Sequence, residues 1–249
     1  MLKFSVVTAV YNNRETVAQA LDSVLSQTYP IVESIVIDGE STDGTLEVLD
    51  SYRSYLGSLV SERDNGIYDA LNKGIKRSTG DVVGFLHADD VFENNDVLAK
   101  IAAIFENPNI DAVYGDLVYV QHNDISKVVR YWKSGHYDVS LLSLGWMPPH
   151  PTFYVRRSIY DQLGAFDTRY RIAADYDTIL RFMGEGKIRT YYIPEVMVRM
   201  RIGGISNRSI KTIFRKSIED FNVIRRNKVG GIFTLLCKNS RKVSQFLIK

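Results

Sequence analysis

The sequence has little cysteine, little proline and no long hydrophobic run. Its 249 residues include one cysteine, Cys237, so no internal disulfide forms and a reducing compartment is expected. Six prolines, 17 glycines, 24% charged and 45% hydrophobic residues exclude a collagen-like, disordered or coiled-coil chain. No stretch reaches the roughly 20 apolar residues that a transmembrane helix needs. The segment after Met1 reads as a strand and not as a signal peptide, which predicts a cytoplasmic protein.

A large overall charge is also missing, because the formal net charge is only +2. The charge is nevertheless unevenly distributed. Residues 1–205 contain 20 Lys and Arg against 27 Asp and Glu, whereas residues 206–249 contain 11 against two, Glu219 and Asp220. We therefore predict an acidic domain over residues 1–205 and a basic tail over residues 206–249.

Apolar residues of the tail recur at helical spacing, from Ile210 through Ile213 to Ile224, with Lys and Arg between them. A basic amphipathic helix suits the anionic inner surface of a cell membrane, which predicts a peripheral membrane protein. The alternative is a helix that packs on the acidic domain and pairs its basic face with it. Nucleic acid is not an expected partner, because no nucleic-acid-binding motif accompanies the basic residues.

Strand and helix signals alternate over the first hundred residues and predict an α/β fold. Buried-strand patterns occur at residues 4–10, 31–37, 59–60 and 82–86, and helical patterns separate them. The short links predict a mostly parallel sheet flanked by helices. Further along, the patterns predict a hairpin over 117–132, a helix over 173–183 and a strand over 189–193.

Polar side chains follow the predicted strands at their carboxyl ends, at residues 11–13, 38–41, 63–66 and 89–90. Ligands bind at this edge of parallel sheets, so the sequence predicts a carboxylate-rich cleft. Adjacent Asp89 and Asp90 repel each other unless a cation or hydrogen bonds compensate. Mg²⁺ or Mn²⁺ shared with a ligand's phosphates is one solution, and capping of the next helix is the other. Asp38 suits hydrogen bonds from a nucleobase or ribose, or else makes a turn.

Five segments in this order resemble family 2 glycosyltransferases: residues 36–45, 66–75, 80–90, 164–167 and 174–177. The resemblance covers roughly residues 3–205. It implies a GT-A fold, a nucleotide-sugar donor, a divalent metal ion and inversion at the anomeric carbon.

The same resemblance assigns residues by position. It implies a nucleotide pocket that includes Thr8, Ala9, Tyr11, Asp38, Asp64, Asn72, Lys73 and Asp89. Asp89 matches the metal-binding carboxylate of the family's Asp-x-Asp motif, and Asp90 stands beside it, so both are expected at Mn²⁺ or Mg²⁺. Asp175 matches the catalytic base. A base is needed because a sugar hydroxyl is a poor nucleophile, and a positioned carboxylate contributes about 10²–10⁴-fold.

The sequence departs from the family pattern at several positions. His87 stands where the first Asp of Asp-x-Asp usually lies, and residues 201–206 lack the histidine that some relatives use as a metal ligand. His150 is a candidate substitute, with a role in packing or in the acceptor loop as the alternative.

The expected activity is hexosyl transfer from a nucleotide sugar to a lipid-linked saccharide in bacterial surface-polysaccharide synthesis. A UDP-sugar is favoured over a GDP-sugar. The alternatives are a sugar nucleotidyltransferase, which would need a Gly-rich loop after the first strand, and a non-catalytic carbohydrate-binding relative.

Overall fold

The computed structural model describes residues 1–203 and 210–244, so the predicted boundary after residue 205 lies outside the described residues. The strands are β1 (Phe4–Val10), β2 (Val32–Asp38), β3 (Ser58–Ser61), β4 (Val82–Phe85), β5 (Val91–Phe92), β6 (Ala112–Gln121), β7 (Asp124–Trp132), β8 (Tyr154–Arg156) and β9 (Thr190–Arg201). The α-helices are α1 (Val17–Leu25), α2 (Thr45–Tyr52), α3 (Ile67–Arg77), α4 (Val97–Phe105), α5 (Arg157–Leu163), α6 (Ala174–Leu180), α7 (Ile210–Arg226) and α8 (Ile232–Ser244). Short helical turns are η1 (Arg53–Tyr55), η2 (Val139–Leu144), η3 (His150–Thr152) and the π-helical η4 (Arg181–Glu185).

Within the described residues, nine strands form one sheet in the order β3-β2-β1-β4-β8-β6-β9-β5, with β7 paired to β6. Strands β3, β2, β1 and β4 are all parallel, and β6 is parallel to β9. The pairs made by β5, β7 and β8 are antiparallel. The predicted α/β fold with helices around the sheet is therefore confirmed. The parallel part is the one at whose carboxyl ends the cleft is predicted, and a mixed part follows it in the sheet.

Alternating side chains give each face of the sheet its own helices. Phe4 and Val6 of β1 pack in one cluster with α1 and α4, whereas Val7 packs in another with α3, α5 and α6. Gly74 in α3 permits a close approach, because a Cβ there would lie 2.2 Å from Val7 Cγ1. This two-sided packing holds β1 at the centre of the parallel part, with its carboxyl end at the cleft.

The shortest strands are the elements that the sequence patterns did not predict. Strand β8 lies antiparallel between β4 and β6, so that Val155 is opposite both Val83 and Ala112. Strand β5 has two residues and pairs with the far end of β9. Runs this short show no usable periodicity. Strand β9 also continues to Arg201, well beyond its predicted end at residue 193.

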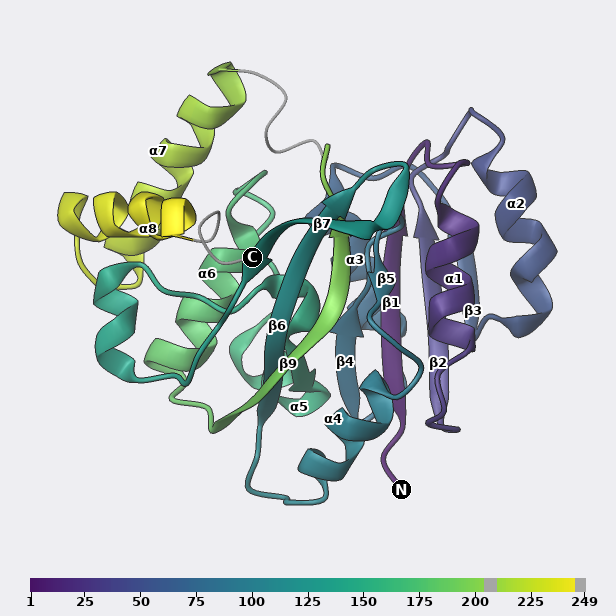
Figure 1. The fold of residues 1–249 in the computed structure, drawn as a ribbon, viewed down its shortest axis with the longest axis horizontal. Coiled ribbons are helices and arrows are strands. Elements are labelled where there is room, and N and C mark those ends of the chain that lie inside the picture. The colour runs from purple at the N-terminus through teal and green to yellow at the C-terminus, as the bar shows by residue number, and fades with distance from the viewer. Residues whose placement is uncertain (204–209, 245–249) are drawn as a thin grey trace.

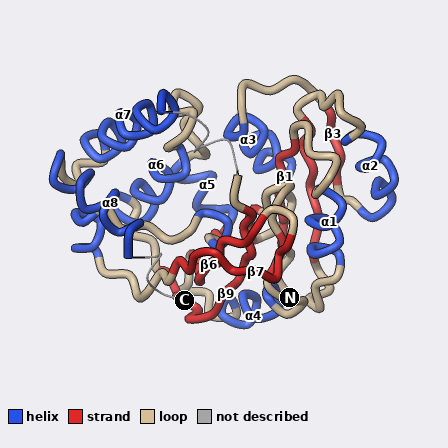
Figure 2. Tube along the Cα trace, turned by 45° about the horizontal axis from the view of Figure 1, so that its top comes forward, coloured by secondary structure: helices blue, strands red, loops and turns tan. Residues whose placement is uncertain are grey.

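Helices α7 and α8 lie together at the side of the molecule opposite α2 (Figures 1 and 2). Val223 and Ile224 of α7 are fully buried in the cluster that also contains Tyr176 and Phe182. The inner face of α7 thus packs on the domain through buried apolar residues, whereas the predicted packing alternative placed the basic face of the tail there. No helix in residues 1–203 or 210–244 has the length and apolar character needed to cross a bilayer.

Candidate active site

The carboxyl ends of β1, β2 and β3 meet at one place, as predicted. A Cβ at Gly39, directly after β2, would lie 2.5 Å from Asp64 Oδ2 and 3.3 Å from the Tyr11 ring. Glycine at this position therefore lets Tyr11 and Asp64 close around the end of β2. Tyr11 is 62% exposed, which leaves its ring free to contact a ligand. Asp64 is half-buried and accepts a hydrogen bond from the Gly66 amide at 2.8 Å.

Thr8 and Ala9 lie on β1 behind this edge. Thr8 is fully buried, and its Oγ1 has no hydrogen-bond partner. Ala9 is half-buried and packs against the hydrophobic cluster that contains Val7. Their role in the predicted nucleotide pocket therefore remains a prediction, and the structure places both residues against the core.

Asp38 is fully buried at the end of β2 and already has three protein partners. Its Oδ2 accepts hydrogen bonds from the Ser41 amide at 3.1 Å and from Ser61 Oγ at 2.6 Å, and its Oδ1 accepts one from Ser41 Oγ. An ionised carboxylate offers about four acceptor positions. The Asp38 carboxylate therefore mainly fixes the loop after β2. Few of its acceptor positions remain for hydrogen bonds from a nucleobase or ribose.

Asn72 and Lys73 of α3 are also engaged by the protein itself. The Asn72 amide donates to the Phe166 carbonyl and accepts from the Phe166 amide, both at 2.9 Å. Lys73 Nζ donates to the Arg63 carbonyl at 2.7 Å and lies 3.2 Å from Glu62 Oε1. Asn72 thus joins α3 to the segment before α6, and Lys73 joins α3 to the end of β3.

The two adjacent acids after β4 have different surroundings. Asp90 is fully buried; the Arg201 amide donates to its Oδ1 at 3.1 Å, and its Oδ2 has no partner. Burial, and then the Asp89 charge, raise the pKa of Asp90 well above its usual value. The Arg201 guanidinium donates to the carbonyls of Asp89 and His122 and to Gln19 Oε1. Asp90 is therefore expected to have a structural role, because it is buried and bonded to the Arg201 backbone. Asp89 is the better placed of the two acids to contact a ligand.

Asp89 is half-buried, and none of the described residues forms a hydrogen bond or ion pair with its carboxylate. The described ranges contain no group of three or more His, Cys, Asp or Glu that suits a metal ion. Mg²⁺ typically binds through one or two carboxylates together with substrate phosphates. A free carboxylate at the cleft fits that mode, in which a bound diphosphate completes the coordination.

Asp175 lies in the first turn of α6 and faces Tyr68 of α3. The Tyr68 hydroxyl lies 3.0 Å from Asp175 Oδ1 and 2.8 Å from the Ile172 carbonyl oxygen, and shares its proton between them. Burial, followed by the Asp175 charge, raises the pKa of Tyr68 well above its usual value, so that the phenol remains a donor. The amide of Tyr176 also donates to Asp175 Oδ1, at 2.8 Å. These contacts fix one carboxylate oxygen and leave Oδ2 available.

Two histidines lie beside the acids. Burial lowers the pKa of His87, while the Asp89 and Asp175 charges act in the opposite direction. The His87 and His150 ring centres are 6.0 Å apart, and His150 stacks on Phe85 at 4.9 Å. Among the described residues, none is a hydrogen-bond partner of the buried atoms His87 Nδ1 and His150 Nε2. The site thus combines the Asp89 carboxylate, which the described residues leave unbonded, with the positioned Asp175 carboxylate, a pair suited to binding a polar ligand and accepting a proton.

The sequence profile of glycosyl transferase family 2 matches residues 5–201. The chain belongs to glycosyl transferase family 2. A PGL/p-HBAD biosynthesis glycosyltransferase of Mycobacterium bovis is 32% identical over 220 residues, which cover 86% of this chain and 83% of that relative. An uncharacterised glycosyltransferase of a Nostoc species is 28% identical over 217 residues, which cover 83% of this chain and 66% of the relative.

Solved structures share the fold at low sequence identity. S. aureus TarS 1–349 in complex with UDP-GlcNAc aligns with a TM-score of 0.68 and 18% identity, covering 98% of this chain and 71% of TarS. A Pyrobaculum calidifontis mannosyltransferase in complex with GDP-Man and Mn²⁺ aligns with a TM-score of 0.67 and 19% identity, covering all of this chain and 76% of the other. The GT-A fold expected from the motifs is confirmed.

Two contributors to this family 2 site were not assigned from the sequence. Tyr68 lies inside a recognised segment but contacts a carboxylate 107 positions away, and no local pattern indicates that contact. Arg201 holds the turn at Asp89 from the end of β9, a strand that was predicted too short. The profile ends at residue 201, before helices α7 and α8, whereas the alignment with TarS covers 98% of this chain.

Proposed function

We propose that this family 2 enzyme is an inverting hexosyltransferase that uses a nucleotide-sugar donor and a lipid-linked saccharide acceptor in bacterial surface-polysaccharide synthesis. The observation that carries the proposal is the half-buried Asp175, whose Oδ1 is held by Tyr68 at 3.0 Å beside the free Asp89 carboxylate. Inversion needs one base and no covalent intermediate on the protein. A single fixed carboxylate with one unoccupied oxygen supports that route.

The donor we favour is a UDP-sugar, with a GDP-sugar as the second choice. Structural neighbours of the same fold were solved with UDP-GlcNAc and with GDP-Man and Mn²⁺. In this chain Tyr11 and Asp64 surround the end of β2, where a nucleoside would lie between the exposed ring and the carboxylate. Asp89 would hold Mn²⁺ or Mg²⁺ against the diphosphate, and the ion would neutralise the charge of the leaving nucleotide.

Asp175 would act on the acceptor. Its free Oδ2 would take the proton from the acceptor hydroxyl as that oxygen attacks the anomeric carbon from the face opposite the leaving group. Tyr68 keeps the carboxylate from rotating, because its hydroxyl is anchored at the same time to the Ile172 carbonyl. His87 and His150 would add to this part of the site as neighbouring imidazole rings, with ring centres 6.0 Å apart.

The test compares Asp175→Asn with Asp89→Ala. Both variants and the unaltered enzyme are assayed for turnover with a panel of four donors, UDP-glucose, UDP-galactose, UDP-GlcNAc and GDP-mannose. Calorimetry with Mn²⁺ measures nucleotide binding. Asp175→Asn should keep the nucleotide dissociation constant within about twofold while turnover falls by on the order of 10²-fold or more. Asp89→Ala should weaken Mn²⁺-dependent binding about tenfold or more. Full turnover in Asp175→Asn would remove Asp175 as the base.

The same panel separates the alternatives. A sugar nucleotidyltransferase would form a nucleotide sugar from a sugar phosphate and a nucleoside triphosphate, and family membership gives that reaction no support. A non-catalytic relative would bind a donor without releasing nucleotide in the presence of any acceptor. Turnover by the unaltered enzyme, lost in Asp175→Asn, contradicts both.

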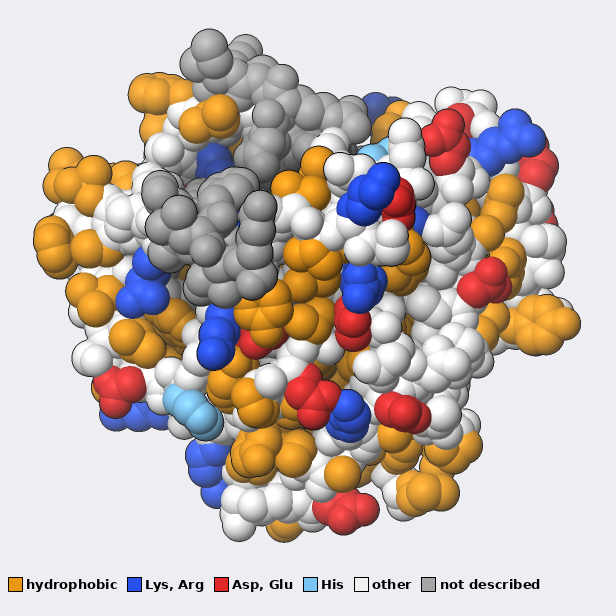
Figure 3. Space-filling model, in the orientation of Figure 1, with side chains coloured by type: hydrophobic (Ala, Val, Ile, Leu, Met, Phe, Trp, Pro, Cys, Tyr) orange, Lys and Arg blue, Asp and Glu red, His pale blue; other side chains and the backbone are white. Residues whose placement is uncertain are grey.

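We also place the enzyme at the inner face of the cell membrane, with α7 and α8 as the contact. Phe214 of α7 is 69% exposed and Phe233 of α8 is 67% exposed, although most apolar residues elsewhere are buried. Hydrophobic side chains gather along the edge of the molecule where these helices lie (Figure 3). Arg225 and Lys228 are exposed at the end of α7 and in the link to α8. Their positive charges would favour binding to anionic lipids. A lipid-linked acceptor would be reached from that position.

A further inference from the structure

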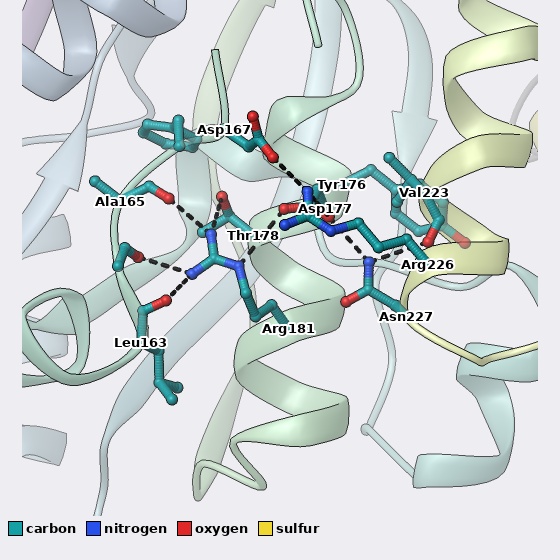
Figure 4. A network of polar contacts seen from close by, with 12 residues as sticks. Leu163, Ala165, Asp167, Tyr176, Asp177, Thr178, Arg181, Val223, Arg226 and Asn227 are labelled. Carbon is teal, nitrogen blue, oxygen red and sulfur yellow. Dashed lines mark hydrogen bonds and ion pairs between the residues drawn. The ribbon is translucent and has the colours of Figure 1, made fainter. Parts of the chain in front are cut away.

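Helices α7 and α8 contact the segment that carries the proposed catalytic base. Arg226 of α7 forms an ion pair with Asp167, and Asn227 Nδ2 donates to Asp177 Oδ1 at 3.0 Å (Figure 4). Lys238 of α8 lies 3.2 Å from the centre of the Tyr176 ring and pairs with Asp220 of α7 at 2.6 Å. The segment before and within α6 is therefore held by helices that lie outside the family profile.

Glu219 makes the most direct of these contacts. Its Oε2 accepts hydrogen bonds from the amides of Ile172 at 2.8 Å and Ala173 at 3.2 Å. Its Oε1 accepts one from Arg215 Nε at 2.9 Å. Glu219 is only 8% exposed, so a carboxylate in this position is stable because its oxygens are paired.

This contact fixes the start of α6. The residue before the helix is Ala173, which has no side-chain acceptor, and the first amides of a helix have no partner within the helix. Glu219 reaches from α7 to the amide of Ala173 and to that of Ile172 before it, and we call these two contacts the Glu219 cap. Its negative charge lies at the positive end of the helix dipole.

The cap acts next to the base. Asp175 is the second residue of α6, two positions after the amide that Glu219 holds. Ile172 is fixed at both polar atoms, because its amide donates to Glu219 and its carbonyl accepts from Tyr68. Tyr68 is also the partner of Asp175. Glu219 and Tyr68 thus hold the turn that places the carboxylate.

We propose that Glu219 is a positioning residue for Asp175, so that α7 forms part of the active-site structure as well as the molecular surface. The proposal rests on the proposed function, because it takes Asp175 as the base. Removing the cap should let the start of α6 open and displace the carboxylate, and small displacements of a reacting group cost on the order of tenfold to a hundredfold in rate.

The experiment uses the full chain with Mn²⁺ and either UDP-GlcNAc or GDP-mannose, whichever the unaltered enzyme hydrolyses, and measures nucleotide release. Glu219→Ala should lower kcat by roughly ten- to a hundredfold with the UDP or GDP dissociation constant unchanged. Hydrogen exchange at Ile172 and Ala173 should accelerate by roughly two- to thirtyfold, the range for a lost helix cap. Glu219→Gln keeps an acceptor oxygen and should restore most of both properties.

Arg226→Ala is the matched control, because it breaks another contact between α7 and the domain without touching residues 172–176. It should leave kcat within about twofold. An equal loss of kcat in Arg226→Ala, or full kcat in Glu219→Ala despite faster exchange, would overturn the proposal. Full activity in Asp175→Asn would instead overturn the base assignment, so the two failures are distinguishable.

Discussion

Tyr68 and Asp175 form a donor–acceptor pair whose chemistry depends on the phenol staying protonated. The raised pKa of Tyr68 has burial as its main cause, and the Asp175 charge adds to it. The hydroxyl therefore donates throughout the physiological pH range, which leaves Asp175 as the proton acceptor that the proposed function requires. Tyr68 is the residue of α3 that bonds this carboxylate within the described residues, so the pair offers a sharp test at the level of single residues.

Replacing Tyr68 by Phe should lower kcat about tenfold while the dissociation constant for the nucleotide stays within about twofold, because orientation of the base is lost and donor contacts remain. Steady-state kinetics and calorimetry measure the two effects. Tyr131→Phe is the matched control: it also removes a hydroxyl that donates to a carboxylate, at 2.7 Å to Asp116, but on β7 and β6. Equal kinetics in the two variants would contradict the role of Tyr68.

Sequence motifs identified the acids at this scale but not their partners. Asp89 and Asp175 stand in segments whose residue types and order are typical of the family, and the structure leaves both with carboxylate oxygens available. Asn72 stands in an equally typical segment, yet its amide is bound to the Phe166 backbone. Which polar atom is already satisfied depends on contacts far apart in the sequence, so a local pattern does not predict it.

At the level of elements, α7 and α8 have an inner and an outer face with different properties. The inner face buries Val223 and Ile224, and the outer face exposes large apolar side chains. The sequence predicted these helices because apolar residues recur at helical spacing over many residues. The packing alternative placed the basic face against the domain, whereas the structure buries Val223 and Ile224 there.

The outer face gives the prediction for membrane binding. The double variant Phe214→Glu and Phe233→Glu should reduce binding to vesicles that contain phosphatidylglycerol by about tenfold or more, since apolar area is lost and negative charge is added. Co-sedimentation at low and high salt measures the change. The control is Tyr55→Glu, which alters an equally exposed aromatic residue (69%) at η1. Undiminished binding of the double variant would contradict a membrane contact through α7 and α8.

At the level of the whole molecule, buried titratable groups predict how stability depends on pH. Burial lowers the pKa of His150 to about 4, with the Asp175 charge opposing the shift. For Glu33, burial acts to raise the pKa, but hydrogen bonds from Lys3, Ser5 and Thr79 outweigh it and lower the pKa to about 2. In both cases the unfolded chain binds a proton more readily than the folded one, so acid favours unfolding.

The free energy of unfolding should therefore fall in two stages as the pH is lowered. His150 contributes up to about 3 kcal/mol, which is lost between pH values of about 6.5 and 4. The contribution of Glu33 is present above its unfolded pKa and is lost as the pH falls toward about 2. Asp90 has the opposite sign, because its raised pKa makes the folded protein hold a proton. Urea unfolding over a pH series measures the sum.

His150→Gln isolates the first stage, because the new side chain does not titrate. Between pH 6.5 and 4 the variant should lose less stability than the unaltered protein, while the steeper loss below pH 4 persists. Parallel curves for the two proteins over that range would show that His150 is not buried as a neutral imidazole.

The burial of Val223 and Ile224 sets a limit on how this protein can be divided. The family profile ends at residue 201, but the hydrophobic core ends only in the C-terminal helices. A chain cut at the profile's end would expose the apolar surface around Tyr176 and Phe182 to water and would favour aggregation. Exchanging tails between relatives would likewise change the exposed outer face and part of the hydrophobic core in one step, so tail and domain are expected to vary together in evolution.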